Sequence, residues 1–100
     1  MLQKGGCVYI LTNSTHSVLY TGVTSDLVTR ICQHRNKVYP NSFSIKYNCS
    51  KLVYYCMYLH IEEAIAAEKA IKGGSRQSKV NLVNQFNPKW DDLYNSVVNL

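Results

Sequence analysis

The sequence predicts a single small domain of the α/β class, of the α+β type, in which three short strands are interspersed with helices. Two apolar runs flank a polar turn near the N-terminus, a longer apolar run covers Lys51–Leu59, and a helical stripe covers Ile61–Lys72. One hundred residues provide for one modest core and leave no room for a second. We therefore expect residues 1–100 to form one domain.

The first third of the chain predicts a β-hairpin that leads directly into a helix. The apolar runs Val8–Leu11 and Val18–Tyr20 are separated by a polar segment of turn-forming residues. Gly22 ends the second run, and Ser25 or Asp26 can then cap a helix.

Four side chains of this region are expected to converge. Tyr9 and Tyr20 come from the paired strands, whereas Arg30 and His34 project from one face of the helix because they lie four residues apart. A phenol or imidazole can hold or deprotonate a water, and a guanidinium can offset the charge that develops on a phosphate. The set fits phosphodiester hydrolysis. On these residues alone, packing tyrosines and a solvated helix face remain the simpler interpretation.

The composition favours an anionic partner such as nucleic acid, because the net charge is +5, with eleven Lys and Arg against six Asp and Glu. No apolar run approaches the ~18 residues that a membrane span needs, and the first residues carry no secretory apolar core. We therefore expect no membrane association and a cytoplasmic location. The four cysteines are scattered, which predicts reduced thiols and neither a zinc site nor disulfides.

A loop is predicted over residues 35–48, where the chain is polar and broken by Pro40. Lys46 and Tyr47 belong to a series of basic and aromatic residues that could grip a nucleic-acid backbone and stack on bases. Anchoring of the loop to the core is the alternative. The run Lys51–Leu59 follows, and its continuous apolar character predicts a central strand that is covered on both faces.

The helix predicted at Ile61–Lys72 carries a carboxylate on its apolar side. The stripe on that side consists of Ile61, Ala64, Ile65 and Ile71. Glu68 falls in the middle of the stripe, and a buried carboxylate is costly unless it is paired or binds a metal. A functional role is favoured, with a buried salt bridge to Arg30 or a lysine as the alternative.

Gly73-Gly74 ends this helix, and Ser75 is expected to cap the next one. Lys72, Arg76 and Lys79 surround the junction, either as a phosphate-binding face or as a merely solvated basic patch.

Further on, Asn87-Pro88 breaks the second of these helices. A final short helix is predicted over Lys89–Tyr94, with Trp90 and Leu93 covering the core and the last residues fraying.

Together these residues resemble the GIY-YIG endonuclease superfamily, in particular its small single-domain bacterial branch. That branch is similar to the N-terminal nuclease domain of the excision-repair incision subunit. The matching positions, which span about residues 5 to 94, are Cys7-Val8-Tyr9 for the first triplet, Tyr20-Thr21-Gly22 for the second, Arg30 and His34 for the helix motif, and Glu68 for the metal-binding glutamate.

The resemblance implies a small three-stranded antiparallel sheet flanked by helices and a metal-dependent DNA endonuclease. One divalent ion, Mg²⁺ or Mn²⁺, would have Glu68 as its sole protein ligand, and Arg30 would stabilise the phosphate. Tyr9 would be a general base or a water-orienting phenol, Tyr20 a second hydroxyl near the scissile phosphate, and His34 a group that helps activate or orient the nucleophile. Nicked or branched DNA in repair or recombination is the expected substrate, with RNA as an alternative.

The sequence departs from the family pattern in places. Cys7 replaces the first glycine, Thr21 replaces an isoleucine, and Val23 stands where some members have a lysine. These changes leave a second hypothesis, a non-catalytic nucleic-acid-binding module derived from a nuclease. An isolated domain is expected to be weakly active without a protein partner for targeting, and to be a monomer or a weak dimer.

Overall fold

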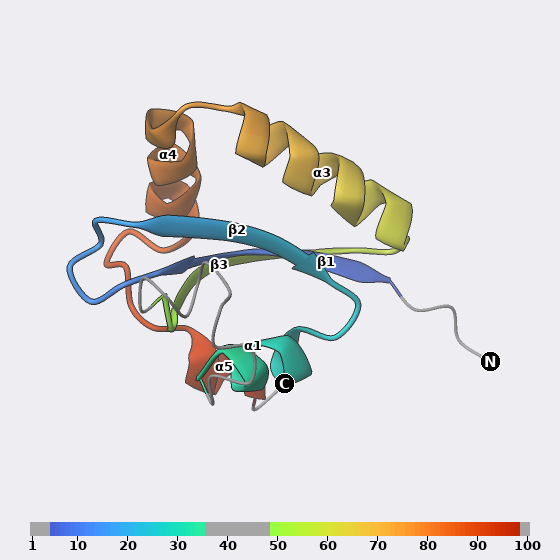
Figure 1. The fold of residues 1–100 in the computed structure, drawn as a ribbon, viewed down its shortest axis with the longest axis horizontal. Coiled ribbons are helices and arrows are strands. Elements are labelled where there is room, and N and C mark those ends of the chain that lie inside the picture. The colour runs from blue at the N-terminus through green and yellow to red at the C-terminus, as the bar shows by residue number, and fades with distance from the viewer. Residues whose placement is uncertain (1–4, 36–48, 99–100) are drawn as a thin grey trace.

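The three strands form one antiparallel sheet in the order β2-β1-β3 (Figure 1). The protein is represented by a computed structural model, which describes residues 5–35 and 49–98. Strand β1 covers Gly6–Thr12, β2 covers Leu19–Thr24 and β3 covers Lys51–Tyr58. The predicted hairpin and the predicted three-stranded antiparallel sheet are confirmed.

Helices cover both faces of this sheet. Helices α3 (Ile61–Gly73) and α4 (Arg76–Phe86) lie on one face, and α1 (Leu27–Arg35) and α5 (Tyr94–Val98) lie on the other (Figure 1). We call these the α3/α4 face and the α1/α5 face. Within the described part of the chain, no helix combines the length and the apolar character that crossing a membrane requires.

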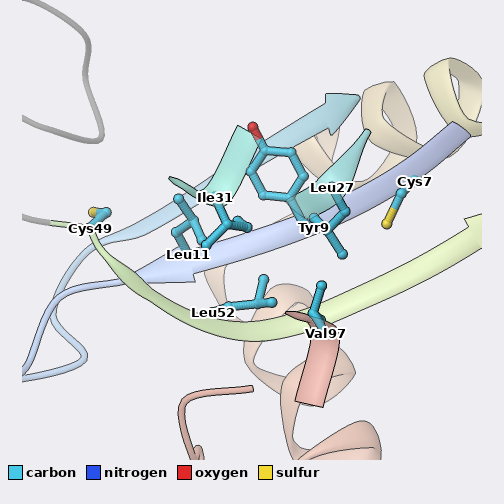
Figure 2. Close-up of a cluster of buried hydrophobic side chains, with 8 residues drawn as sticks. All are labelled: Cys7, Tyr9, Leu11, Leu27, Ile31, Cys49, Leu52 and Val97. Atoms are coloured by element: carbon cyan, nitrogen blue, oxygen red, sulfur yellow. The ribbon is translucent and has the colours of Figure 1, made fainter. Parts of the chain in front are cut away.

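The core has two parts, one on each face, because successive side chains of a strand point to opposite sides. Figure 2 shows the larger part, on the α1/α5 face, which consists of Cys7, Tyr9, Leu11, Leu27, Ile31, Cys49, Leu52 and Val97. The smaller part, on the α3/α4 face, contains Ile10, Val53 and Val83. Strand β1 contributes to both, and all seven of its residues are buried.

The prediction that Lys51–Leu59 forms the central strand is wrong, because β1 lies between the other two strands and β3 lies at one side of the sheet. The predicted cover on both faces is nevertheless confirmed, and it accounts for the continuous apolar character of β3. The consecutive residues Leu52 and Val53 are both fully buried because Leu52 belongs to the core of the α1/α5 face and Val53 to that of the α3/α4 face. The register with β1 shifts between Ile10 and Leu11, where β3 has one extra residue.

The predicted helix at Lys89–Tyr94 is also wrong. Trp90 has a positive φ of 55°, which a right-handed helix does not accept, and the side chain of Asn87 donates hydrogen bonds to the carbonyls of Val53 and Asp91 at 3.2 and 2.8 Å. Helix α5 starts later instead. It packs Val97, which is 1% exposed, into the core. Residues 96–98 are therefore helical, contrary to the expectation of fraying, and residues 99–100 lie outside the described part of the structure.

Candidate active site

The ring of Tyr9 lies across β2 at Gly22. The two residues are paired in the antiparallel ladder, and a Cβ atom at Gly22 would collide with Cζ and the hydroxyl of Tyr9. Glycine is therefore required at this position for the ring to lie this close to the strand. Tyr20 of β2 lies beside Tyr9, with 6.3 Å between the centroids of the two rings. Both tyrosines lie on the α1/α5 face.

Helix α1 brings Arg30 to these two tyrosines. The helix is capped by Asp26, one of the two predicted caps, whose carboxylate accepts hydrogen bonds from the amide and hydroxyl of Thr29 at 3.3 and 2.7 Å. Arg30 is half-buried on the first turn. Burial raises the pKa of Tyr9, and the positive charge of Arg30 opposes this rise, which puts the guanidinium within electrostatic range of the phenol.

The net effect on Tyr9 is nevertheless a pKa well above the ordinary value of 10. Burial is the largest cause, because the side chain is 1% exposed, and the neighbouring Tyr20 adds to it. The phenol is consequently protonated at neutral pH. Of the two roles that the resemblance implies for Tyr9, this favours the water-orienting hydroxyl over the general base.

Three predicted residues cannot be placed in the same detail. His34 belongs to α1, four residues after Arg30 as expected, but its side chain lies outside the described part of the structure. Lys46 and Tyr47 fall in residues 36–48, which also lie outside it.

Glu68 belongs to α3, which lies on the opposite face of the sheet from α1, the helix of Arg30 (Figure 1). It is 9% exposed and lies on the buried side of the helix with Ala64, as predicted, whereas Ile65 is 37% exposed and does not belong to the buried stripe. The carboxylate pairs with Lys72, with 2.5 Å between Oε2 and Nζ. The alternative of a salt bridge to a lysine is thus present, and the partner is not Arg30.

Two contacts define where Glu68 lies above the sheet. A Cβ atom at Gly6 would be 2.7 Å from the Cβ of Ala64, so the first half of α3 rests directly on the start of β1. At the other end of the helix, Ile71 packs against the core cluster of Ile10. Glu68 lies between these points and therefore faces the middle of β1 and β2.

Thr21 faces the same layer, because it pairs with Ile10 and so shares the α3/α4 face. Its side chain is 4% exposed, and its hydroxyl is the one buried side-chain oxygen or nitrogen without a hydrogen-bond partner among the described residues. Buried polar groups are ordinarily satisfied. The layer under α3 thus holds a carboxylate and an unused hydroxyl, both hard oxygen donors.

These donors fit a hard divalent cation better than a soft one. Among the described residues there is no group of three or more His, Cys, Asp and Glu side chains that could surround a metal. Glu68 would therefore hold such an ion with few protein ligands, which suits Mg²⁺ because this ion keeps several waters and takes oxygens from phosphates.

The predicted basic cluster lies at the junction of α3 and α4. Lys72 is occupied by Glu68, Arg76 Nη2 donates to the carbonyl of His16 at 2.9 Å, and Lys79 Nζ donates to the carbonyl of Gly74 at 3.0 Å. The junction itself forms as expected, since Ser75 caps α4 and accepts a hydrogen bond from the amide of Ser78 at 3.1 Å.

The sequence profile of the GIY-YIG catalytic domain matches residues 5–81, which is more than half of the chain. The chain belongs to the GIY-YIG family. The GIY-YIG catalytic domain is the catalytic domain of a nuclease family. No curated protein and no solved structure matches the chain significantly.

The departure from the GIY-YIG pattern at Cys7 is accommodated in the core. The thiol is 2% exposed within the cluster on the α1/α5 face, and burial raises its pKa to about 11, so it is an unreactive packing group. The close approach to α3 occurs instead at the preceding residue, Gly6.

Sequence reasoning missed two features of this site. The sequence assigns Gly22 to the end of an apolar run and to the second triplet, but it does not reveal the contact with Tyr9 that makes this glycine part of the site. The strand register could have shown this, because pairing the two triplets in an antiparallel hairpin sets this glycine opposite that tyrosine. The unpartnered hydroxyl of Thr21 has no sequence signal, since it depends on what α3 places above it.

Proposed function

We propose that this protein is a metal-dependent endonuclease that hydrolyses phosphodiester bonds in DNA. The observation that carries the proposal is the group formed by Tyr9, Tyr20 and Arg30, which lies within the part of the chain that matches the family. An arginine next to two phenols supplies positive charge and oriented hydroxyls, and phosphoryl transfer depends on positioning and charge stabilisation of this kind.

Arg30 holds the scissile phosphate and offsets the negative charge that develops on it. Tyr9 stays protonated and donates a hydrogen bond that orients the attacking water or a phosphate oxygen, while Tyr20 supplies a second hydroxyl. His34, one turn further along α1, helps activate or orient the nucleophile.

Glu68 is the protein ligand of a single divalent ion, Mg²⁺ or Mn²⁺. When bound, the ion supplies Lewis-acid stabilisation and a more acidic water. Glu68 and Arg30 come from helices on opposite faces of the sheet, so a site that includes both would lie at an edge of the sheet. We place it at the edge strand β2, because the ring of Tyr9 lies against Gly22 of that strand.

In the absence of a metal ion, Lys72 neutralises the carboxylate of Glu68. Its side chain is 53% exposed, so it can leave the carboxylate and turn to a substrate phosphate without a large cost. Lys72 therefore belongs to the DNA contacts, together with Arg76 and Lys79 and, in residues 36–48, Lys46 and Tyr47.

The substrate that we propose is nicked or branched DNA, in repair or recombination in the cytoplasm, with RNA as the alternative polymer. Target choice relies on a protein partner, and the chain acts as a monomer or a weak dimer. One observation supports a second function, a non-catalytic binding module: the carboxylate of Glu68 already has a lysine partner.

Cleavage by the purified protein tests the proposal. Wild type and Glu68→Gln are incubated with nicked, branched, single-stranded and duplex DNA, and with RNA, in Mg²⁺, Mn²⁺ or a chelator. We expect cutting that requires both the metal and Glu68, whereas Glu68→Gln binds DNA within a few-fold of wild type. Glu62→Gln, an exposed carboxylate in the first turn of the same helix, serves as the matched control and should cut normally.

Two outcomes would change the proposal. Cutting that survives Glu68→Gln would remove the metal role of this residue. The absence of cutting on every substrate, with salt-sensitive binding intact, would favour the binding module.

A further inference from the structure

A cluster of basic and aromatic groups lies at the hairpin end of the sheet, apart from Tyr9 and Arg30. The Nζ of Lys51 is 2.9 Å from Nε2 of His16, and the imidazole packs on the indole of Trp90 with 4.9 Å between ring centroids. Arg76 Nη2 donates to the backbone carbonyl of the same histidine. We call Lys51, Arg76, His16 and Trp90 the hairpin-end cluster.

The cluster is assembled from four separate segments: the turn between β1 and β2, the first residue of β3, the first residue of α4 and the loop that follows α4. It lies on the α3/α4 face, because Trp90 packs on the core of that face. Glu68 and Lys72 come from the same face. A strand of nucleic acid that contacts Lys72 at the end of α3 can therefore continue towards the cluster.

The backbone is strained at the two rings of the cluster. His16 and Trp90, with φ of 59° and 55°, are the non-glycine residues with positive φ in the described part of the chain. Left-handed backbone costs such residues about 1–2 kcal/mol, and strain of this kind concentrates at functional sites. The side chain of Asn13 holds the turn in place, since its Oδ1 accepts from the amides of Ser17 and Val18 at 2.9 and 3.2 Å.

Among the described contacts, the carboxylate nearest to Lys51 is that of Asp92, whose Oδ1 accepts from the amide of Leu52 at 3.2 Å. Within residues 5–35 and 49–98, no carboxylate pairs with Lys51 or Arg76. His16 accepts from the ammonium through Nε2, so its ring is neutral, and its pKa is lowered first by loss of solvation and second by the charge of Lys51. Two cations that form no ion pair with a carboxylate, next to a neutral imidazole that can accept a proton, favour a bound anion.

We infer that Lys51, Arg76 and His16 form a second phosphate-binding site, which holds a backbone phosphate of the nucleic acid away from the scissile bond. The inference rests on the proposed function for the identity of the polymer. Thr12, the last residue of β1, pairs with Lys51 of the cluster in the sheet. It lies three residues after Tyr9, or roughly 10 Å along the strand. Because Tyr9 and the cluster also lie on opposite faces of the sheet, this distance is a lower limit for the separation of the two phosphates, and it corresponds to about three base pairs at 3.4 Å of rise.

Binding measured in chelator tests the site without any need for cleavage. The variants are Lys51→Gln and the double variant Lys51→Gln/Arg76→Gln, and the control is Lys69→Gln, an exposed lysine of α3. We expect the double variant to bind duplex DNA about tenfold more weakly and to reduce the slope of log K against log salt by about 0.9, the value for one phosphate contact. The control should change neither quantity.

Two further readouts separate a specific site from general attraction. Trimming the duplex by single base pairs from each end should remove the difference between wild type and the double variant once the outlying phosphate is gone. Wild-type affinity should also rise as the pH falls from 7 to 5.5, because a bound phosphate offsets the charge of Lys51 and favours protonation of His16. His16→Gln should remove this rise of affinity at low pH. The groups in contact with His16 are Lys51, Arg76 and Trp90.

An equal loss of affinity in Lys69→Gln, or a loss that is independent of duplex length, would overturn the inference. The single variant Lys51→Gln keeps the hydrogen bond from Arg76 to the turn. If the double variant fails to fold, the loss of DNA affinity can therefore still be measured in the single variant. The binding measurements contain no metal and need no cleavage. They therefore test the second phosphate site even if the protein does not cut DNA, and failure of the one proposal can be told from failure of the other.

Discussion

The two faces of the sheet differ in how the proposed chemistry is related to the core. On the α1/α5 face, Tyr9 is at once a candidate catalytic group and a fully buried member of the larger hydrophobic cluster. On the α3/α4 face, the core consists of aliphatic residues, and the cations Lys51, Lys72 and Arg76 lie at its margin. Substitutions of buried residues on the first face should therefore change folding and activity together, whereas the half-exposed Arg30 and the cations of the second face can be changed with little effect on folding.

Arg30→Ala is expected to have the largest effect on activity, about a hundredfold or more in turnover, because it removes the cation that offsets charge in the transition state. Arg30 is only half-buried, so stability should change little. Single-turnover cleavage at saturating DNA measures the effect, and Gln33→Ala on the same helix is the control. A loss confined to DNA affinity would reduce Arg30 to a positioning contact.

A pair of glycine substitutions compares the two faces directly. Gly22→Ala forces a Cβ atom against the ring of Tyr9, and Gly6→Ala places one 2.6 Å from Cδ1 of Ile61 and 2.7 Å from Cβ of Ala64. Each should lower the free energy of unfolding by about 1–3 kcal/mol, as overpacking does, measured by urea denaturation.

The two variants should differ in cleavage. Gly22→Ala displaces a catalytic side chain and should lose activity even when it is fully folded, whereas Gly6→Ala should retain most of its activity under the same conditions. Equal activity in the two folded variants would contradict the distinction that we draw between the faces.

Tyr9→Phe should reduce cleavage by about tenfold, the value of one hydrogen bond of about 1.4 kcal/mol. The packing of the ring is preserved. Since burial raises the pKa of Tyr9, the phenol stays neutral between pH 6 and 9, and the pH profiles of wild type and variant should have the same shape. A rise of wild-type activity with pH that disappears in the variant would instead identify Tyr9 as a general base.

The same pKa shift has a consequence for stability. Because the folded state keeps the proton above the ordinary pKa of 10, the stabilisation from Tyr9 is present below pH 10 and is lost as the pH rises beyond it. Tyr9→Phe should therefore show a smaller loss of stability in alkaline solution than wild type, as monitored by thermal unfolding between pH 9 and 11.

Lys72→Met should have the smallest effect on cleavage. The ion pair joins a half-exposed lysine to a Glu68 side chain that is only 12% exposed, so its removal should also lower the free energy of unfolding. Removing a lysine that competes for the carboxylate should strengthen Mn²⁺ binding a few-fold and weaken DNA binding by a similar factor. Calorimetric titration with Mn²⁺ measures the first effect, and unchanged affinity would show that the pair does not compete with the metal.

The sequence by itself determined the local elements and the family. The hairpin, the capped start of α4 and the position of Glu68 on the buried side of α3 follow from residue spacing, because these features depend on neighbours only a few residues away. Spacing along the chain was also enough to recognise the two triplets and Arg30, since the tyrosines and this arginine belong to one continuous segment.

The tertiary structure decided what depends on contacts between distant segments. An apolar strand such as β3 has the same pattern at the side of a sheet as in the middle, and only the pairing of β1 with both neighbours shows which strand is central. The positive φ of Trp90 and the late start of α5 are imposed by hydrogen bonds from Asn87 to a strand more than thirty residues earlier. The hairpin-end cluster likewise exists only because folding brings four segments together, and no spacing along the chain encodes that meeting.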